Sequence, residues 1–226
     1  MVKQVIIFIA PPGAGKGTQA ELVAHKFGFY HLESSKILEE KLADQENSSD
    51  PEIREAWRLY KRGELMTPLL VARLIAEEIR RFHGDGKSII FSGSFRTLEE
   101  AQKETPIVEE LYGKSNIKIF NITLSEQESI KRNSGRRICQ LSRHPIPDFP
   151  QYHDLTTCPQ DGSPIIKREL DKPEIIKERY RVYKAETEPV LDYLKENGYH
   201  VMTINGEQPI ERVFEDISKH LQNDSS

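Results

Sequence analysis

A stretch near the N-terminus, VIIFIAPPGAGKGT from Val5 to Thr18, joins an apolar run to a glycine-rich turn that ends in lysine. A buried strand, a tight turn and a helix in this order gather backbone N–H groups and a helix N-terminus around one point. Glycine lets the backbone approach a bound group closely, and lysine and threonine there can meet phosphates or Mg²⁺. The stretch predicts a nucleotide phosphate site formed by Gly13, Ala14, Gly15, Lys16, Gly17 and Thr18.

This turn departs from the general template GxxxxGK(S/T) at two positions. Ala10 stands where the template begins with glycine, and Gly17 delays the hydroxyl to Thr18. The alternative is an ordinary turn of glycine and proline, but the preceding strand and the following helical pattern favour nucleotide binding.

The elements that must position this loop alternate along the chain. Apolar runs predict strands at Gln4 to Ala10, Phe29 to Leu32, Ser88 to Phe91, Ile117 to Ile122 and His200 to Ile204. Helical patterns cover Gly15 to Phe27, Thr67 to Phe82, Leu98 to Tyr112, Ser125 to Arg136, Lys172 to Asn197 and Pro209 to Leu221. Pro189 should bend or divide the fifth helix. The alternation predicts an α/β fold, a five-stranded parallel sheet flanked by helices.

Two segments interrupt the alternation and are interpreted as insertions into a single unit, 1–226. Residues 34–66 are polar, charged and helical in character, whereas residues 137–170 are rich in Pro, His, Gly and Asp and carry both cysteines. Regular elements resume on both sides of each segment. The predicted core is therefore 1–33, 67–136 and 171–221.

Composition excludes several classes of function. The 226 residues carry a formal net charge of -4, which gives no support for an electrostatic grip on nucleic acid. The N-terminal apolar run is too short for a signal peptide or a membrane span, so we expect a cytoplasmic protein without a membrane partner. Two cysteines argue against a disulfide framework, which leaves a metal site or two ordinary thiols.

Further motifs recur in order along the chain. They are PPGAGKGTQAE, Gly63-Glu-Leu-Met-Thr67, Gly93 with Arg96-Thr97, Arg132-Asn-Ser-Gly-Arg-Arg137, Arg168 with Asp171 and Arg179, and Asn205-Gly-Glu-Gln-Pro209. Together they closely resemble the adenylate kinase family of nucleoside monophosphate kinases, over essentially the whole chain. The resemblance implies a P-loop kinase core with an acceptor-binding insertion (34–66) and a lid (137–170). It also implies a monomer that uses Mg²⁺ to catalyse ATP + AMP ⇌ 2 ADP.

The resemblance also assigns roles to residues. The implied catalytic set is Lys16, Arg96, Arg136, Arg168 and Arg179, with Asp171 orienting the arginines. Donor-side contacts beyond the loop would be Arg132, Arg136, Gly206 and Gln208. Acceptor-side contacts would be Ser34, Glu64, Met66, Gly93, Arg96, Glu100, Arg168 and Arg179. Arginine suits these roles because a guanidinium stays ionised and binds phosphate oxygens through two N–H groups.

Departures from the family pattern concentrate on the acceptor side. The family's DGFPRT reads Ser92-Gly-Ser-Phe-Arg-Thr97 here, so a hydroxyl replaces the carboxylate that organises magnesium-bound water. The family's TGDxxR aligns with residues 34–39 and places Glu39 where an arginine is expected, with Lys36 as a substitute cation one turn earlier.

Glu100 stands where the family has a glutamine that reads the acceptor base. An ionised carboxylate only accepts hydrogen bonds, which suits a guanine edge better than an adenine edge. GMP, CMP or UMP therefore remain alternative acceptors, unless Glu100 points to solvent. A P-loop nucleotide-binding regulator with decayed catalysis is the alternative from another class, but the acceptor-side Arg96 argues against it.

The lid carries a candidate metal site. Some family members hold a structural zinc here through Cys and His or Asp pairs, whereas others use a polar network. Cys139, His144, Cys158 and Asp161 would supply a closed tetrahedron of sulfur, nitrogen and oxygen ligands, with His153 as the competing imidazole. Two thiols that only line the lid are the alternative.

Overall fold

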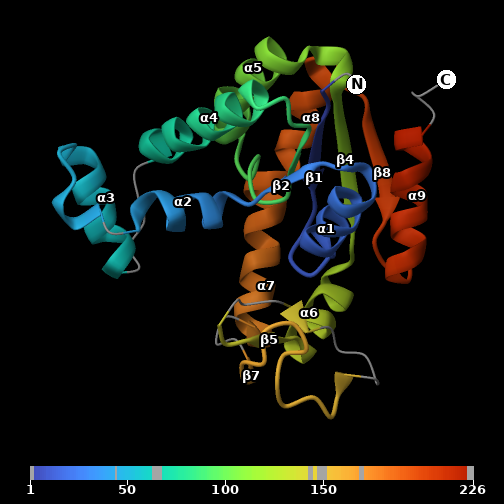
Figure 1. Ribbon diagram of the computed structural model, residues 1–226. Coiled ribbons are helices and arrows are strands. Elements are labelled where there is room, and N and C mark those ends of the chain that lie inside the picture. The colour runs from blue at the N-terminus through green and yellow to red at the C-terminus, as the bar shows by residue number, and fades with distance from the viewer. Residues whose placement is uncertain are drawn as a thin grey trace.

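A parallel sheet forms the centre of the molecule (Figure 1). The computed structural model describes residues 3–43, 45–62, 68–141, 145–146, 152–167 and 171–222. The strands are β1 (Val5–Ile9), β2 (Tyr30–Leu32), β3 (Ile89–Phe91), β4 (Ile117–Thr123) and β8 (Val201–Asn205). Their spatial order is β2-β3-β1-β4-β8, and every pair is parallel. This confirms the predicted α/β class, and the strand bounds differ from those predicted by one residue at most at either end.

Helices cover both faces of this sheet. The helices packed on the sheet are α1 (Lys16–Phe27), α4 (Pro68–Gly84), α5 (Leu98–Tyr112), α8 (Glu188–Glu196) and α9 (Ile210–Gln222). One buried apolar cluster joins α1 and α9 to the sheet, and a second joins α4, α5 and α8 to it. Alternate residues of β1 enter opposite clusters, Ile6 and Phe8 the first, Ile7 and Ile9 the second. No helix among the described residues combines the length and apolarity that a membrane span requires.

The long C-terminal helical segment differs in detail from the prediction. It comprises α7 (Pro173–Val182), a π-helical turn η5 (Tyr183–Thr187) and α8. Pro189 was expected to bend or divide the helix, and the segment is divided there: Pro189 lies in the first turn of α8, where proline is tolerated because it lacks the N–H group. The irregular turn is η5, immediately before it.

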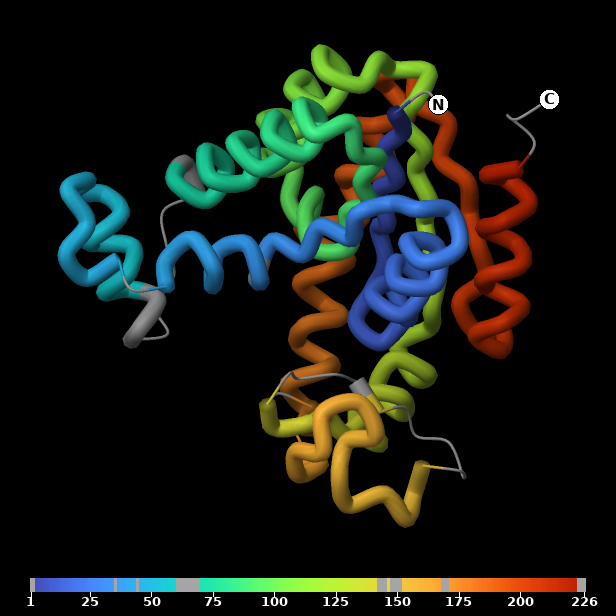
Figure 2. Tube along the Cα trace, in the orientation of Figure 1, coloured from blue at the N-terminus to red at the C-terminus, as the bar shows by residue number. Residues whose placement is uncertain are grey.

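Two groups of elements stand off the sheet (Figures 1 and 2). Helices α2 (Ser34–Leu42) and α3 (Pro51–Arg62), with the 3₁₀ turn η1 (Gln45–Asn47), form an arm on one side. A three-stranded antiparallel sheet of β5 (Arg137–Cys139), β6 (Pro145–Ile146) and β7 (Ile165–Lys167) lies beyond α6 (Glu126–Gly135) and α7. A further 3₁₀ turn, η2 (Lys114–Asn116), leads into β4. The insertion boundaries at 34–66 and 137–170 stay predictions.

The turn between β8 and α9 is locked against the end of β4, and this contact requires glycine. The Gly206 N–H donates to the Thr123 carbonyl at 2.9 Å. A Cβ atom at Gly206 would lie 2.6 Å from that oxygen and 2.8 Å from the Ile122 Cγ2 atom. Any larger residue must therefore push the turn away from the strand.

We predict that Gly206→Ala lowers the free energy of unfolding by about 1–3 kcal/mol, as overpacking against a rigid backbone does. The matched control is Gly84→Ala at the exposed end of α4, where the added Cβ meets no atom within 4 Å. Alanine favours a helix, so the control should be neutral or slightly stabilising. Urea denaturation measures the free energy of unfolding of both variants. Equal effects of the two changes would contradict the requirement for glycine at position 206.

Candidate functional site

The predicted phosphate loop connects β1 to α1. Gly13 and Gly15 have φ angles of 80° and 84°, a conformation that favours glycine. Gly15 precedes the first helical residue, Lys16, so the N-terminus of α1 opens onto the loop. Helix N-termini with free backbone N–H groups bind anions. The backbone therefore has the form of a phosphate cradle, as the sequence predicts.

Positive charge converges on this loop. Lys16 donates to the Ala10 carbonyl, and burial together with the charges of Arg96 and Arg179 lowers the pKa of Lys16 to about 7. Arg96 follows β3 and Arg179 lies on α7. The structure thus brings together one lysine and two arginines from three separate parts of the chain.

Asp171 is the counter-charge of the predicted arginine set. Arg136 binds it through two hydrogen bonds, Nε to Oδ2 at 2.9 Å and a terminal nitrogen to Oδ1 at 2.6 Å. Arg179 lies 3.9 Å from the same carboxylate. Asp171 is 6% exposed, whereas the guanidinium groups are partly open to solvent. The carboxylate therefore holds the arginines from the protein side and leaves them accessible.

The predicted donor-side residues also lie together. Arg132, on α6, donates to the Gly206 carbonyl at 2.8 Å and to Glu128 at 2.9 Å. The Gln208 side-chain amide donates to the Asn205 carbonyl in its own turn and to Asp216 on α9, at 3.0 Å each. The structure therefore connects α6 to the β8–α9 turn.

The acceptor-side residues surround the end of β3. A Cβ atom on Gly93 would lie 3.4 Å from a guanidinium nitrogen of Arg96 and 3.5 Å from the Ser34 nitrogen. Ser34 hydrogen-bonds Ser94, with their hydroxyl oxygens 2.7 Å apart. Glu100 accepts a hydrogen bond from the Arg96 backbone N–H at 2.7 Å. Its carboxylate is thus engaged with the main chain beside Arg96.

The residues that depart from the family pattern have partners of their own. Ser92 and the ring of His31 are joined by a 2.6 Å hydrogen bond, and burial lowers the pKa of His31. Lys36 pairs with Glu33 at 2.5 Å, and this hydrogen bond raises the pKa of Lys36. The Lys36 side chain is 60% exposed and an exposed ion pair is weak, so its use as a substitute cation stays a prediction. Glu39 is exposed on α2.

Part of the predicted metal group lies together in the small antiparallel sheet. The ligand atoms of Cys139, Cys158 and Asp161 are all within 4.8 Å of one another. The Cys139 thiol donates to Asp161 at 3.3 Å, and both thiols are buried. Burial raises the pKa of Cys158, although the backbone N–H groups of Gln160 and Asp161 oppose this by donating to its sulfur. Two sulfurs and one carboxylate so arranged could hold a metal ion.

Four predicted site residues lie outside the described residues. They are Glu64, Met66, His144 and Arg168. His153, the competing imidazole, is described and exposed.

The sequence did not predict the contacts between α6 and the phosphate loop. Ser129, which is fully buried, donates to the Pro12 carbonyl at 2.7 Å. Asn133, one turn later, occupies the space that a Cβ on Gly13 would need. Both polar residues lie four apart on a helix, a spacing that identifies a common face, but nothing in the sequence indicates that this face meets the loop.

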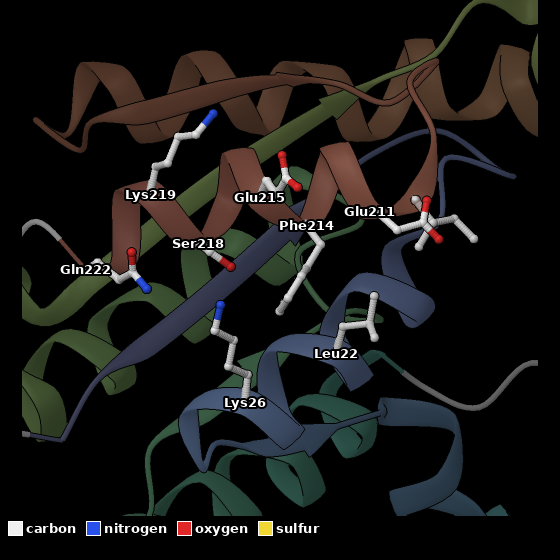
Figure 3. A pocket seen from close by; sticks show the side chains of 9 residues that line it. Leu22, Lys26, Glu211, Phe214, Glu215, Ser218, Lys219 and Gln222 are labelled. Atoms are coloured by element: carbon white, nitrogen blue, oxygen red, sulfur yellow. The ribbon is translucent and has the colours of Figure 1, made fainter.

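A separate hollow of about 540 Å³ lies between α1 and α9 (Figure 3). Leu22, Lys26 and Phe214 contribute to its lining, with other residues of α9. None of the predicted nucleotide contacts lines it, so it is not part of the site described above.

A phosphate loop on a parallel sheet, faced by arginines from other elements, defines the class of P-loop nucleotide-binding proteins. Comparison with known proteins is more specific. The adenylate kinase family model matches residues 8–199. An adenylate kinase of Petrotoga mobilis is 34% identical over 96% of this chain and 95% of its own. Those of Methanothrix thermoacetophila and Archaeoglobus fulgidus are each 32% identical, over 96% of this chain and 97% of theirs. The chain belongs to the adenylate kinase family.

Proposed function

We propose that this protein transfers the γ-phosphoryl group of ATP to AMP reversibly, giving two ADP. The observation that carries the proposal is the convergence of Lys16, Arg96 and Arg179 at the open N-terminus of α1. Phosphoryl transfer needs little covalent work from a protein, but it needs two phosphate chains aligned and their charge compensated. The relatives named adenylate kinase, matched over nearly full length, support AMP as the acceptor.

Each side of the site has its own task in this proposal. Lys16 and the loop N–H groups bind the donor phosphates, and Arg132 lies along the donor base beside Gly206. Arg96 binds the acceptor phosphate near Gly93 and Ser34. Arg136 and Arg179, oriented by Asp171, stabilise the charge of the transferring group.

Mg²⁺ accompanies ATP in this family. In this chain, the hydroxyls of Thr18 and Ser92 are the groups that would hold it together with the phosphates. A small divalent ion that retains several waters fits such a set, because the phosphates supply the negative charge. The ion would neutralise charge on the β- and γ-phosphates. Ser92, fixed by His31, offers an oriented hydroxyl oxygen in place of the family's carboxylate.

We also propose that the lid holds a structural zinc ion through Cys139, Cys158 and Asp161, with His144 as the fourth ligand. The three described ligands already converge, and backbone N–H groups donate to the Cys158 sulfur, which would stabilise a metal-bound thiolate. A turn runs from Cys158 to Gly162, whose N–H donates to the Cys158 carbonyl at 2.9 Å. A metal ion would fasten a segment too small to bury a core of its own.

For the reaction, a coupled assay with ATP and Mg²⁺ compares AMP, GMP, CMP and UMP as acceptors. We predict the highest kcat/KM with AMP. Lys16→Ala and Arg136→Ala should each lower kcat at least ~100-fold, because this is the usual effect of removing one group that stabilises charge in the transition state. The control is Arg181→Ala, an exposed residue of α7 paired with Glu178 at 2.6 Å, which should change kcat less than about twofold. ATP binding without turnover of any acceptor would indicate a binding protein instead.

For the protonation of Lys16, we predict that ATP binding takes up protons. Lys16 has a pKa of about 7 in the free protein, so it is mostly neutral at pH 8, and bound phosphates raise its pKa. Uptake should approach one proton per ATP near pH 8 and fall to about a quarter near pH 6.5. Calorimetric titrations in buffers of different ionisation enthalpy measure it. The same uptake in Lys16→Met would contradict the assignment.

For the lid, we predict about one zinc ion per chain in protein purified without chelator, measured by plasma mass spectrometry. Cys158→Ser should lose the ion, because a hydroxyl does not replace a thiolate ligand. Asp154→Asn, at an exposed lid position, is the control and should retain it. A content below about 0.2 zinc per chain in the unmodified protein would refute the site.

A further inference from the structure

The turn that carries Arg96 has an unusual backbone. Phe95 has a φ of 58°, which makes it the one residue other than glycine with a positive φ among the described residues. Its side chain is fully buried and packs edge-on against Phe91 at 5.4 Å between ring centroids. A large side chain in this conformation is costly and persists only where its surroundings hold it.

The Phe95 N–H group is buried and needs an acceptor. The family motif DGFPRT has proline at this position, and proline has no N–H to satisfy. In this chain, phenylalanine supplies a donor, which reaches the Glu104 Oε2 atom at 3.2 Å. A buried N–H without a partner would cost about 1–3 kcal/mol, so a nearby acceptor is required.

Glu104 is itself an exceptional residue. It is 4% exposed, on the face of α5 that packs towards the sheet. Burial and the charge of Glu100 raise the pKa of Glu104 to about 8. A carboxyl group that is neutral near pH 7 still accepts a hydrogen bond through its carbonyl oxygen.

Two further contacts fix the next residue of the turn. The Arg96 N–H donates to Glu100 at 2.7 Å, and the Arg96 carbonyl accepts from the Thr187 hydroxyl at 2.6 Å. Thr187 belongs to the π-helical turn η5. With Phe95 held by Glu104, the main chain on both sides of the Arg96 side chain is fixed, and its guanidinium lies over Gly93.

We propose that Glu104 is a positioning residue for the acceptor phosphate: by accepting the Phe95 N–H, it holds the strained turn that aims Arg96 at that phosphate. This inference rests on the proposed function for the role of Arg96. Glu104 acts through the backbone and does not contact the nucleotide. Replacement of Glu104 should therefore weaken the binding of AMP, the phosphoryl acceptor, and leave the binding of ATP unchanged.

The test compares three variants. Glu104→Met removes the hydrogen-bond acceptor of the Phe95 N–H and keeps a side chain of similar volume. Glu104→Gln keeps a carbonyl oxygen that can accept this bond. Thr105→Val is the matched control, because Thr105 is equally buried on α5 (6% exposed) and its hydroxyl makes no hydrogen bond among the described residues. Urea denaturation of each variant verifies folding. Because Glu104→Met removes a buried ionisable group, we expect the variant to fold.

The first readout is amide hydrogen exchange of residues 93–97, which needs no activity. Glu104→Met should speed exchange of the Phe95 amide at least ~10-fold, the equivalent of one lost hydrogen bond, whereas the other two variants change it less than about threefold. Unchanged exchange in folded Glu104→Met would overturn the proposal.

The second readout is steady-state kinetics. We expect Glu104→Met to raise the KM for AMP about 10-fold and the KM for ATP less than about twofold, with the AMP value restored in Glu104→Gln. Equal changes in both KM values would also overturn the proposal. If the unmodified protein turned over no acceptor, the proposed function would fail, and the exchange experiment would still decide whether Glu104 holds the turn.

Discussion

Burial and mutual repulsion of cations form the constraint on which this site depends. Burial, together with the nearby charges of Arg96 and Arg179, lowers the pKa of Lys16 to about 7. Such a shift corresponds to a free energy on the order of several kcal/mol, which opposes folding in the absence of ligand. The protein must therefore hold these groups in place by other interactions, and an anionic ligand relieves the repulsion.

The interactions that hold the cations come from the protein side of each group. The buried carboxylate of Asp171 binds Arg136 and lies near Arg179, but it leaves their outer faces open. Lys16 donates to the Ala10 carbonyl, at the end of a strand that is fully enclosed by both apolar clusters. The phosphate loop is held in turn by Ser129. Apolar packing of the sheet thus supports the charged site one layer away.

The fold could be predicted almost completely, because its signals are local. Apolar runs of strand length alternate with helical patterns, and Thr97 and Ser125 cap α5 and α6 with hydrogen bonds to the backbone three residues on. The π-helical turn η5 was missed because a single wide turn leaves no periodic signal. Proline at 189 did indicate where the helix is divided, because proline is tolerated in the first turn of a helix but not in its interior.

The site could be predicted in part. Its residue types and the phosphate loop follow from motifs, whereas the partners of those residues depend on contacts across the chain. Lys36 illustrates the difference: its charge suggests a phosphate ligand, whereas its ion pair with Glu33, three residues earlier, is visible only in the structure. The Thr187 bond to Arg96 spans 91 residues, and no pattern in either segment indicates it.

On the acceptor side, three of the departures from the family pattern are compensated within this structure. Serine at 92 shares a hydrogen bond with the ring of His31, and the N–H of the non-proline residue at 95 gains an acceptor in Glu104. Glu100 accepts the N–H of Arg96. Loss of function alone would leave such substitutions without partners, since nothing would maintain a buried carboxyl group beneath an unused turn. A rebuilt turn with Arg96 fixed at both of its peptide groups instead favours an acceptor site that still binds phosphate.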